Sequence, residues 1–196
     1  MKFDLTITSL EILTLAGIVV TLIIFMVTYA SGRRQDRHLA HRQIYQRLEL
    51  ASIEVFQNQI EHPELAQIWE VNRTEMRSRK GALPVDSYDA FLYQQLNLFE
   101  MAYRFCKDDL MPTDVFGSWV IWFGDLCSSP YFREFWIGED AVAPLNYVPD
   151  FRKIMTEGCM IYGGEKLNLQ EKRETFFTFV GEELQSETIS QWLRRT

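Results

Sequence analysis

The pattern of hydrophobic and polar positions divides this chain into one unbroken apolar run and a series of amphipathic segments. No charged residue occurs between Glu11 and Arg33, and apolar side chains occupy every face of a helix drawn over that run. A helix on a soluble core would show a polar side, whereas an apolar helix of about 18 or more residues crosses the ~30 Å hydrocarbon core of a bilayer. The sequence therefore predicts a transmembrane helix over residues 10–32, after a short external N-terminus over residues 1–9.

A cleaved signal peptide is the alternative interpretation of the same run. Residues 30–32 would serve as a small-residue cleavage site, but the start of the chain is not basic, and the apolar core is longer than the usual length of about 7–15 residues. Arginines follow the run at once, at Arg33, Arg34, Arg37, Arg42 and Arg47. Because positive charge beside a span favours the cytoplasmic side, we expect an uncleaved anchor with its N-terminus outside and the remainder of the chain in the cytoplasm.

Beyond the predicted anchor, apolar positions continue to recur at helical spacing. Residues 33–61 are typical of a basic juxtamembrane amphipathic helix, and residues 62–196 of a compact cytoplasmic helical domain. The clearest stripe covers residues 87–107, with Asp86 as the expected cap and Asp89 supporting the first turn. The residues of this stripe are Tyr88, Phe91, Leu92, Gln95, Leu96, Leu98, Phe99, Ala102, Tyr103 and Cys106.

Shorter helices are expected on both sides of this stripe. The pattern predicts a helix that begins at Pro63, a polar break over residues 72–85, and helices over residues 115–126, 131–136, 149–163 and 171–192. Gly158, Gly163 and Gly164 are expected to end helices. No strand pattern appears, so the predicted fold class is all-α: one N-terminal transmembrane helix followed by a cytoplasmic helical bundle. The apolar stripe of the 115–126 helix is formed by Val115, Trp119, Trp122, Phe123 and Leu126.

Charge is distributed unevenly along the chain, whose net charge is −7. Residues 33–47 carry a net charge of +4 and residues 48–196 a net charge of −10. An acidic body argues against nucleic-acid binding, which needs a basic surface. The basic collar suits the anionic headgroups of a lipid bilayer. The predicted membrane-surface contacts are Arg33, Arg34, Arg37 and Arg42.

Candidate chemistry is sparse. Cys106, Cys127 and Cys159 are widely spaced and are expected to be reduced, buried residues of a cytoplasmic domain. His38 and His41 share a helix face, but no third and fourth metal ligand accompanies them. No arrangement of nucleophile and base can be defended, so we expect no metal, no cofactor and no catalytic site, although an enzyme is not excluded.

Two features keep a ligand-binding alternative open. Arg73, Arg77, Arg79 and Lys80 form a basic cluster that is a candidate anion contact, against the simpler interpretation of a solvated loop. The aromatic stripes of residues 115–126 and 131–136 would line either a pocket, a groove for a partner or the core, which is the commonest place for such stripes. Converging polar groups would favour the pocket, and an exposed apolar patch would favour a partner.

The succession HPELAQIWE, FLYQQLNLFEMAYRF, FGSWVIWFGDL and SPYFREFWI over residues 62–137 resembles a pattern in uncharacterised bacterial proteins. Those proteins have one N-terminal membrane anchor and a helical cytoplasmic domain of unknown function. The resemblance implies an all-helical fold at a bacterial inner membrane, and it carries no activity or site residues. Our leading hypothesis is a membrane-anchored helical interaction or regulatory module that binds a protein partner or a second copy of itself. The alternative is a membrane-tethered enzyme or ligand sensor that uses an aromatic pocket beside the Arg/Lys cluster.

Overall fold

The structure is a computed structural model that describes Met26, residues 42–139, Ala141 and residues 143–195. The chain divides into two compact units, Met1–Gln43 and Ile44–Thr196. Apart from Met26, the predicted external segment and transmembrane helix lie outside the described residues, as do Arg33, Arg34, Arg37, His38 and His41. Within the described part of the chain, no helix combines the length and the apolar character that a membrane span requires.

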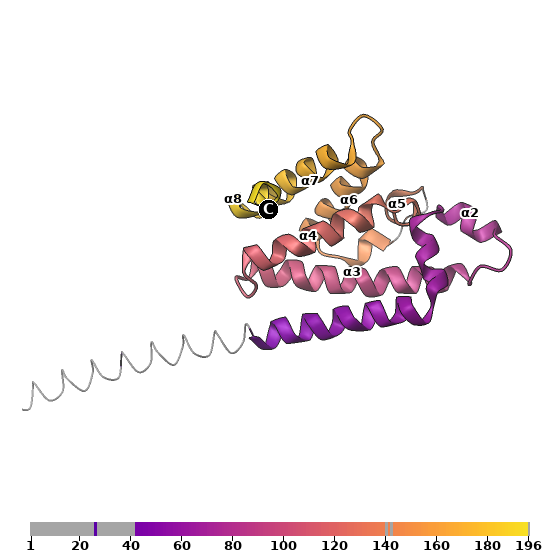
Figure 1. Cartoon of the computed structure of the whole chain (residues 1–196), viewed down its shortest axis with the longest axis horizontal. Coiled ribbons are helices and arrows are strands. Elements are labelled where there is room, and N and C mark those ends of the chain that lie inside the picture. Colours follow the sequence, from indigo (N-terminus) through magenta and orange to yellow (C-terminus); the bar gives the residue numbers. More distant parts are fainter. Residues whose placement is uncertain (1–25, 27–41, 140, 142, 196) are drawn as a thin grey trace, which may run out of the picture. The chain divides into compact units, whose positions relative to one another are not determined.

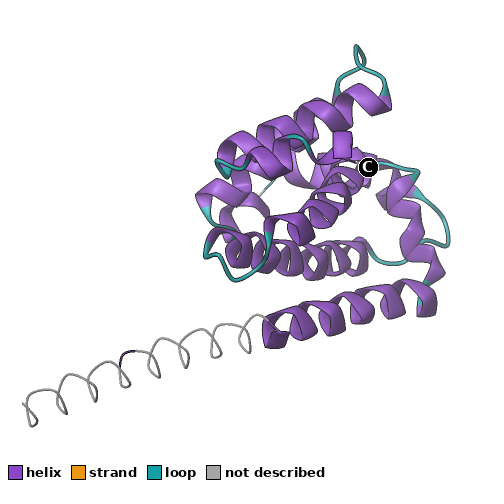
Figure 2. Ribbon diagram, turned by 60° about the vertical axis from the view of Figure 1, so that its left-hand side comes forward, coloured by secondary structure: helices purple, strands orange, loops and turns teal. Residues whose placement is uncertain are grey.

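Helices build the second unit, and no strand occurs among its described residues (Figure 2). The predicted all-α class is therefore confirmed for this part of the chain. A helix described over residues 42–61 comes first, and its residues 44–61 belong to this unit. It is followed by η1 (Pro63–Trp69), α2 (Arg73–Ser78), α3 (Val85–Lys107), α4 (Thr113–Ser128), α5 (Pro130–Ile137), η2 (Ala143–Asn146), α6 (Pro149–Gly163), α7 (Leu169–Glu183), α8 (Glu187–Ser190) and α9 (Trp192–Arg195).

The core forms around α3 and α4. All ten positions of the stripe predicted for α3 are buried, so the prediction of which face of that helix is buried is confirmed. α4 contacts α3, α5, α6, α7 and α8, so it is the central helix of the unit (Figure 1). Gly117 on α4 lets the ring of Trp192 approach the helix backbone, because a Cβ at that position would collide with the indole.

The start of α3 differs from the prediction. Pro84 occupies the N-cap position, and Asp86 lies exposed within the first turn instead of capping the helix. Part of the predicted polar break before α3 is also helical. Asn72 caps α2 by accepting a hydrogen bond from the backbone N–H of Glu75 at 2.8 Å, and a cap of this kind stabilises a short helix that has few buried residues.

The helices after α4 follow the predicted order with two corrections. Gly163 and Gly164 end α6 as expected, but Gly158 lies inside α6, where a Cβ would come within 2.6 Å of the sulfur of Cys127. Gly158 therefore permits close packing of α6 on α4. The single helical region predicted over residues 171–192 is broken into α7, α8 and α9. The chain turns at Gln185, which has a φ of 51°, and left-handed backbone interrupts a helix.

The helix over residues 44–61 belongs to the same compact unit as the rest of the bundle, and this unit begins at Ile44. Figures 1 and 2 both show this helix beside α3. Leu48 and Val55, which lie two turns apart, are buried in the common core. Ile44 and Ala51 pack against that core and are half-buried. One narrow side of the helix thus attaches it to the bundle.

Candidate interaction surface

Away from Leu48 and Val55, the helix over residues 44–61 exposes large apolar side chains. We call this surface the outer face, and Leu50 and Ile60 are its most exposed members, at 68% and 79%. Apolar residues scattered singly over a surface are ordinary, but a contiguous row on one helix marks an interaction site. The outer face consists of Tyr45, Leu50, Ile53, Phe56 and Ile60.

A groove of about 300 Å³ separates one edge of this helix from α4. Tyr45, Leu48 and Phe56 line it from the helix, and Trp119 and Trp122 line it from α4. We call it the aromatic groove. Because Tyr45 and Phe56 belong to both features, the groove and the outer face form one continuous apolar surface.

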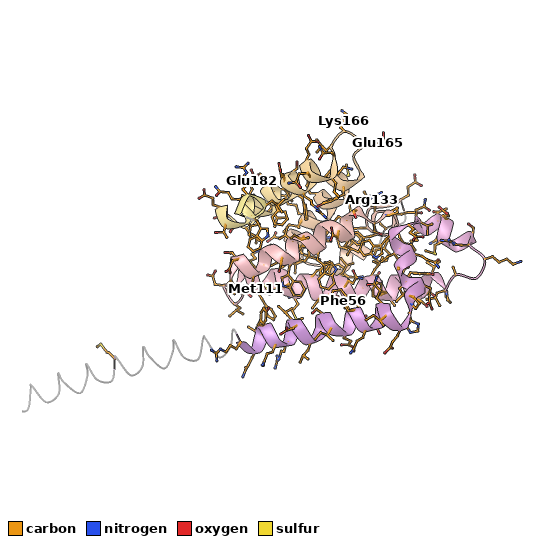
Figure 3. The ribbon with its side chains drawn as sticks, in the orientation of Figure 1. Phe56, Met111, Arg133, Glu165, Lys166 and Glu182 are labelled. Atoms are coloured by element: carbon orange, nitrogen blue, oxygen red, sulfur yellow. The ribbon has the colours of Figure 1, made fainter. Side chains whose placement is uncertain are left out.

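Stacked rings connect this surface to the core. The ring of Phe56, labelled in Figure 3, lies parallel to that of Trp122, with centroids 5.1 Å apart and an interplanar angle of 4°. Trp122 in turn meets Phe99 edge-on at 5.0 Å, and Phe99 is fully buried on α3. Aromatic pairs in these geometries contribute about 0.5–1.5 kcal/mol beyond the area they bury. The groove wall is therefore held in place by the core itself.

The polar lining of the groove consists of the Ser52 and Ser118 hydroxyls and the Glu49 side chain, and both hydroxyls are already engaged. The Ser52 hydroxyl donates to the backbone carbonyl of Glu49 at 2.8 Å, and the Ser118 hydroxyl donates to that of Val115 at 2.7 Å. A small-molecule site needs a few polar groups that converge on the ligand, and these two hydroxyls bond within their own helices. The groove is better suited to apolar side chains of a partner than to a polar ligand.

The predicted stripe of α4 is confirmed at Phe123 and Leu126, which are fully buried, but not at its other three positions. Val115, Trp119 and Trp122 are half-buried, whereas Phe116 and Val120 are fully buried. The stripe of α5 is different: Tyr131, Phe132, Phe135 and Trp136 are all buried. Trp136 also donates its indole N–H to the Thr156 hydroxyl at 3.1 Å. The aromatic residues of α5 are thus core, and the two tryptophans of α4 form the groove.

The basic cluster does not act as one group. The Arg73 guanidinium binds both carboxylate oxygens of Asp89, at 2.6 and 3.2 Å, and Tyr131 donates its hydroxyl to the same carboxylate at 2.9 Å. The hydrogen bond to Asp89 raises the pKa of Arg73. Arg73 therefore joins α2 to α3 and α5. Arg77, Arg79 and Lys80 remain exposed to solvent.

Two other hollows offer poor anion sites. One of about 350 Å³ is lined by apolar side chains, by His62 and by uncharged polar groups that include Asn58 and Gln94, which bond to each other at 2.8 Å. Another of about 410 Å³ lies between α5 and α6 and contains Arg133, whose guanidinium donates to the carbonyl of Ser128. No member of the basic cluster lines either hollow. Of the basic cluster that the enzyme or sensor hypothesis uses as its anion contact, Arg73 is engaged with Asp89, and Arg77, Arg79 and Lys80 are exposed.

The cysteines are buried, unlinked thiols, as expected. Burial, and secondarily the nearby charge of Asp109, raises the pKa of Cys106 to about 11. Such a thiol is protonated and unreactive near neutral pH. Among the residues that the structure describes, no group of His, Cys, Asp and Glu side chains is arranged to hold a metal ion.

Comparisons of the chain with models of protein families, with curated proteins and with solved structures found no match. The resemblance to anchored bacterial proteins stays a prediction, and the surface described above carries the functional argument.

Proposed function

We propose that this protein is a membrane-anchored helical module that binds a protein partner through the outer face and the aromatic groove. The observation that carries the proposal is the continuous apolar surface of the helix over residues 44–61 and α4. Burying apolar surface contributes about 25 cal/mol per Å², and Leu50 and Ile60 leave most of their surface unburied in the isolated unit. A partner that covers these side chains would gain that free energy.

The anchor is part of the same proposal. Residues 10–32 form the transmembrane helix, with the N-terminus outside and the C-terminal domain in the cytoplasm of a bacterial cell. Arg33, Arg34, Arg37 and Arg42 contact anionic headgroups. The support is the uncharged run and the arginines that follow it. The module would therefore meet its partner at the membrane surface.

Photocrosslinking in native membranes tests the binding surface. A photoreactive residue at Leu50 should crosslink to a discrete protein, whereas one at Leu145 should not. Leu145 is the matched control because it is also a leucine and is 70% exposed, but it lies on η2, away from the outer face. Equal crosslinking at the two positions, or none at Leu50, would refute the proposed surface.

Cysteine labelling tests the orientation. The native cysteines are buried, so a cysteine introduced at Thr6 should dominate the labelling of the folded protein. A membrane-impermeant maleimide should label Thr6→Cys in intact cells and should label a Lys166→Cys control only after lysis. Labelling of Thr6→Cys only after lysis would reverse the proposed topology.

A further inference from the structure

Three residues of the outer face belong to a seam with the spacing of a coiled coil, which two glutamines complete. Gln46, Leu50, Ile53, Gln57 and Ile60 follow one another at alternating intervals of four and three residues, and all five are exposed. An interval that averages 3.5 residues keeps side chains on one line along a helix that packs against another helix. Leu48 and Val55, which attach the helix to the bundle, lie on the opposite side. The seam is thus free to meet a second helix.

The charges beside the seam specify how a second copy would bind. Arg47 and Glu54 flank it on one side, seven residues apart, and Glu49 and Phe56 flank it on the other. Arg47 and Glu54 are too far apart along the helix to pair within one chain, because partners on one helix lie three or four residues apart. Their opposite charges are therefore available to another molecule.

A parallel pair of these helices would be disfavoured. In a parallel coiled coil, the residue directly before a seam position such as Leu50 faces the residue five places further on in the partner helix. Glu49 would face Glu54 of the second copy, and this repulsion would occur twice. Like charges in contact lower the stability of such a pair.

An antiparallel pair is self-complementary. When Leu50 packs against Ile53 of the second copy, Arg47 lies beside Glu54 of the second copy, and two-fold symmetry repeats both contacts. Glu49 then lies beside Phe56 of the second copy and meets no like charge. Gln46 faces Gln57 of the second copy, and a polar layer of this kind fixes the register of a coiled coil.

We propose that the partner of the outer face is a second copy of this chain, bound antiparallel through residues 46–60 with Arg47 paired to Glu54 of the second copy. This inference rests on the proposed function, because it names the partner of the same surface. Leu48 and Val55 face their own bundle, so the two bundles lie on opposite sides of the helix pair.

Charge exchange in the full-length protein tests the pairing. Two differently tagged copies are co-expressed and purified in detergent through one tag, and the fraction of the other tag that is recovered measures association. Arg47→Glu alone and Glu54→Arg alone should each lower recovery about tenfold, since each turns two attractions into repulsions. Co-expression of the Arg47→Glu copy with the Glu54→Arg copy should restore recovery, as should the double variant paired with itself.

The possible outcomes separate the sources of association. Contacts between the anchors alone would give equal recovery in every combination, and this would overturn the inference. Stronger recovery with Arg47→Glu alone would also overturn it, because that change adds no repulsion to a parallel pair. If wild-type copies do not co-purify while Leu50 still crosslinks to a different protein, this inference fails and the proposed function stands. If neither occurs, both fail. Circular dichroism checks that the variants, which are exposed, retain their fold.

Discussion

α3 and the helix over residues 44–61 are neighbouring amphipathic helices that use their apolar residues in different ways. α3 buries all ten positions of its stripe. The helix over residues 44–61 fully buries Leu48 and Val55 and leaves large apolar side chains exposed on its other side. The two helices are comparable in length and pattern, so length and amphipathicity alone do not tell a core helix from a binding helix.

The difference lies in how wide the apolar surface of each helix is compared with the contact that the bundle offers. α3 is covered by α4, η1, α2 and the helix over residues 44–61, so its stripe matches its neighbours. The bundle covers the helix over residues 44–61 from one side only. The excess apolar width of that helix is the physical basis of the proposed function.

Removing a ring at each end of the aromatic stack should give the largest contrast. Phe99→Ala should lower the free energy of unfolding by about 3–5 kcal/mol, because truncating a buried phenylalanine leaves a cavity. Phe56→Ala should cost no more than about 1.5 kcal/mol, because its ring is 49% exposed and loses mainly the stack on Trp122. Urea unfolding of the full-length protein in detergent, followed by circular dichroism, gives both values. Similar losses for the two variants would show that Phe56 is as much a core residue as Phe99.

Removing a charge from α3 should have the next largest effect. Asp89→Asn should lower the free energy of unfolding by about 2–3 kcal/mol, because Arg73 is left partly buried without its partner and Tyr131 loses an ionised acceptor. Asp86→Asn is the control: it lies on the same helix, is exposed, and should cost less than about 0.5 kcal/mol. The same urea experiment measures both. A loss below 1 kcal/mol for Asp89→Asn, on the scale of an exposed pair, would mean that the Arg73–Asp89 pair is screened by solvent.

The buried thiol at the end of α3 should make stability fall at alkaline pH. Cys106 has a folded-state pKa of about 11, above the unfolded value of about 8.5. Its contribution is therefore fully present below pH 8.5 and is lost as the pH rises towards 11, because the unfolded chain releases the proton first. The stability of the wild type relative to Cys106→Ala should fall by about 1–2 kcal/mol between pH 8 and pH 10. A pH-independent difference would show that Cys106 is accessible to water.

The sequence predicted α3 better than α4 for a physical reason. Polar residues alternate sharply with apolar ones along α3, so one face alone can be buried. α4 carries apolar residues nearly all round, and its buried side includes the small residues Gly117 and Gly124, whose role depends on Trp192 and Tyr162 from distant segments. When a helix is apolar on every side, its sequence pattern does not show which face is buried. In α4 the buried face is decided by the five helices packed around it.

The candidate site was predictable only in part. Trp119 and Trp122 stand out in the sequence, but their groove exists because Phe56, far away in the chain, stacks on one of them. The partner of Arg73 was missed because Asp89 lies sixteen residues further on, across a turn. Contacts of this kind leave no local pattern, whereas the exposed seam of residues 46–60 follows helical spacing and is visible in the sequence once its buried side is known.

A substitution at the outer face should have the smallest effect on the stability of a single copy. It tests directly whether the helix over residues 44–61 differs from the core helix α3. Leu50→Ala and Leu145→Ala remove equally exposed side chains, so at low protein concentration each should change the free energy of unfolding by less than about 0.5 kcal/mol. As the concentration rises, a second copy that covers Leu50 stabilises the wild type by mass action. At high concentration, Leu50→Ala should then unfold at a lower midpoint temperature than Leu145→Ala. A larger loss at every concentration would mean that Leu50 packs within its own bundle, and the helix over residues 44–61 would then be a core helix like α3.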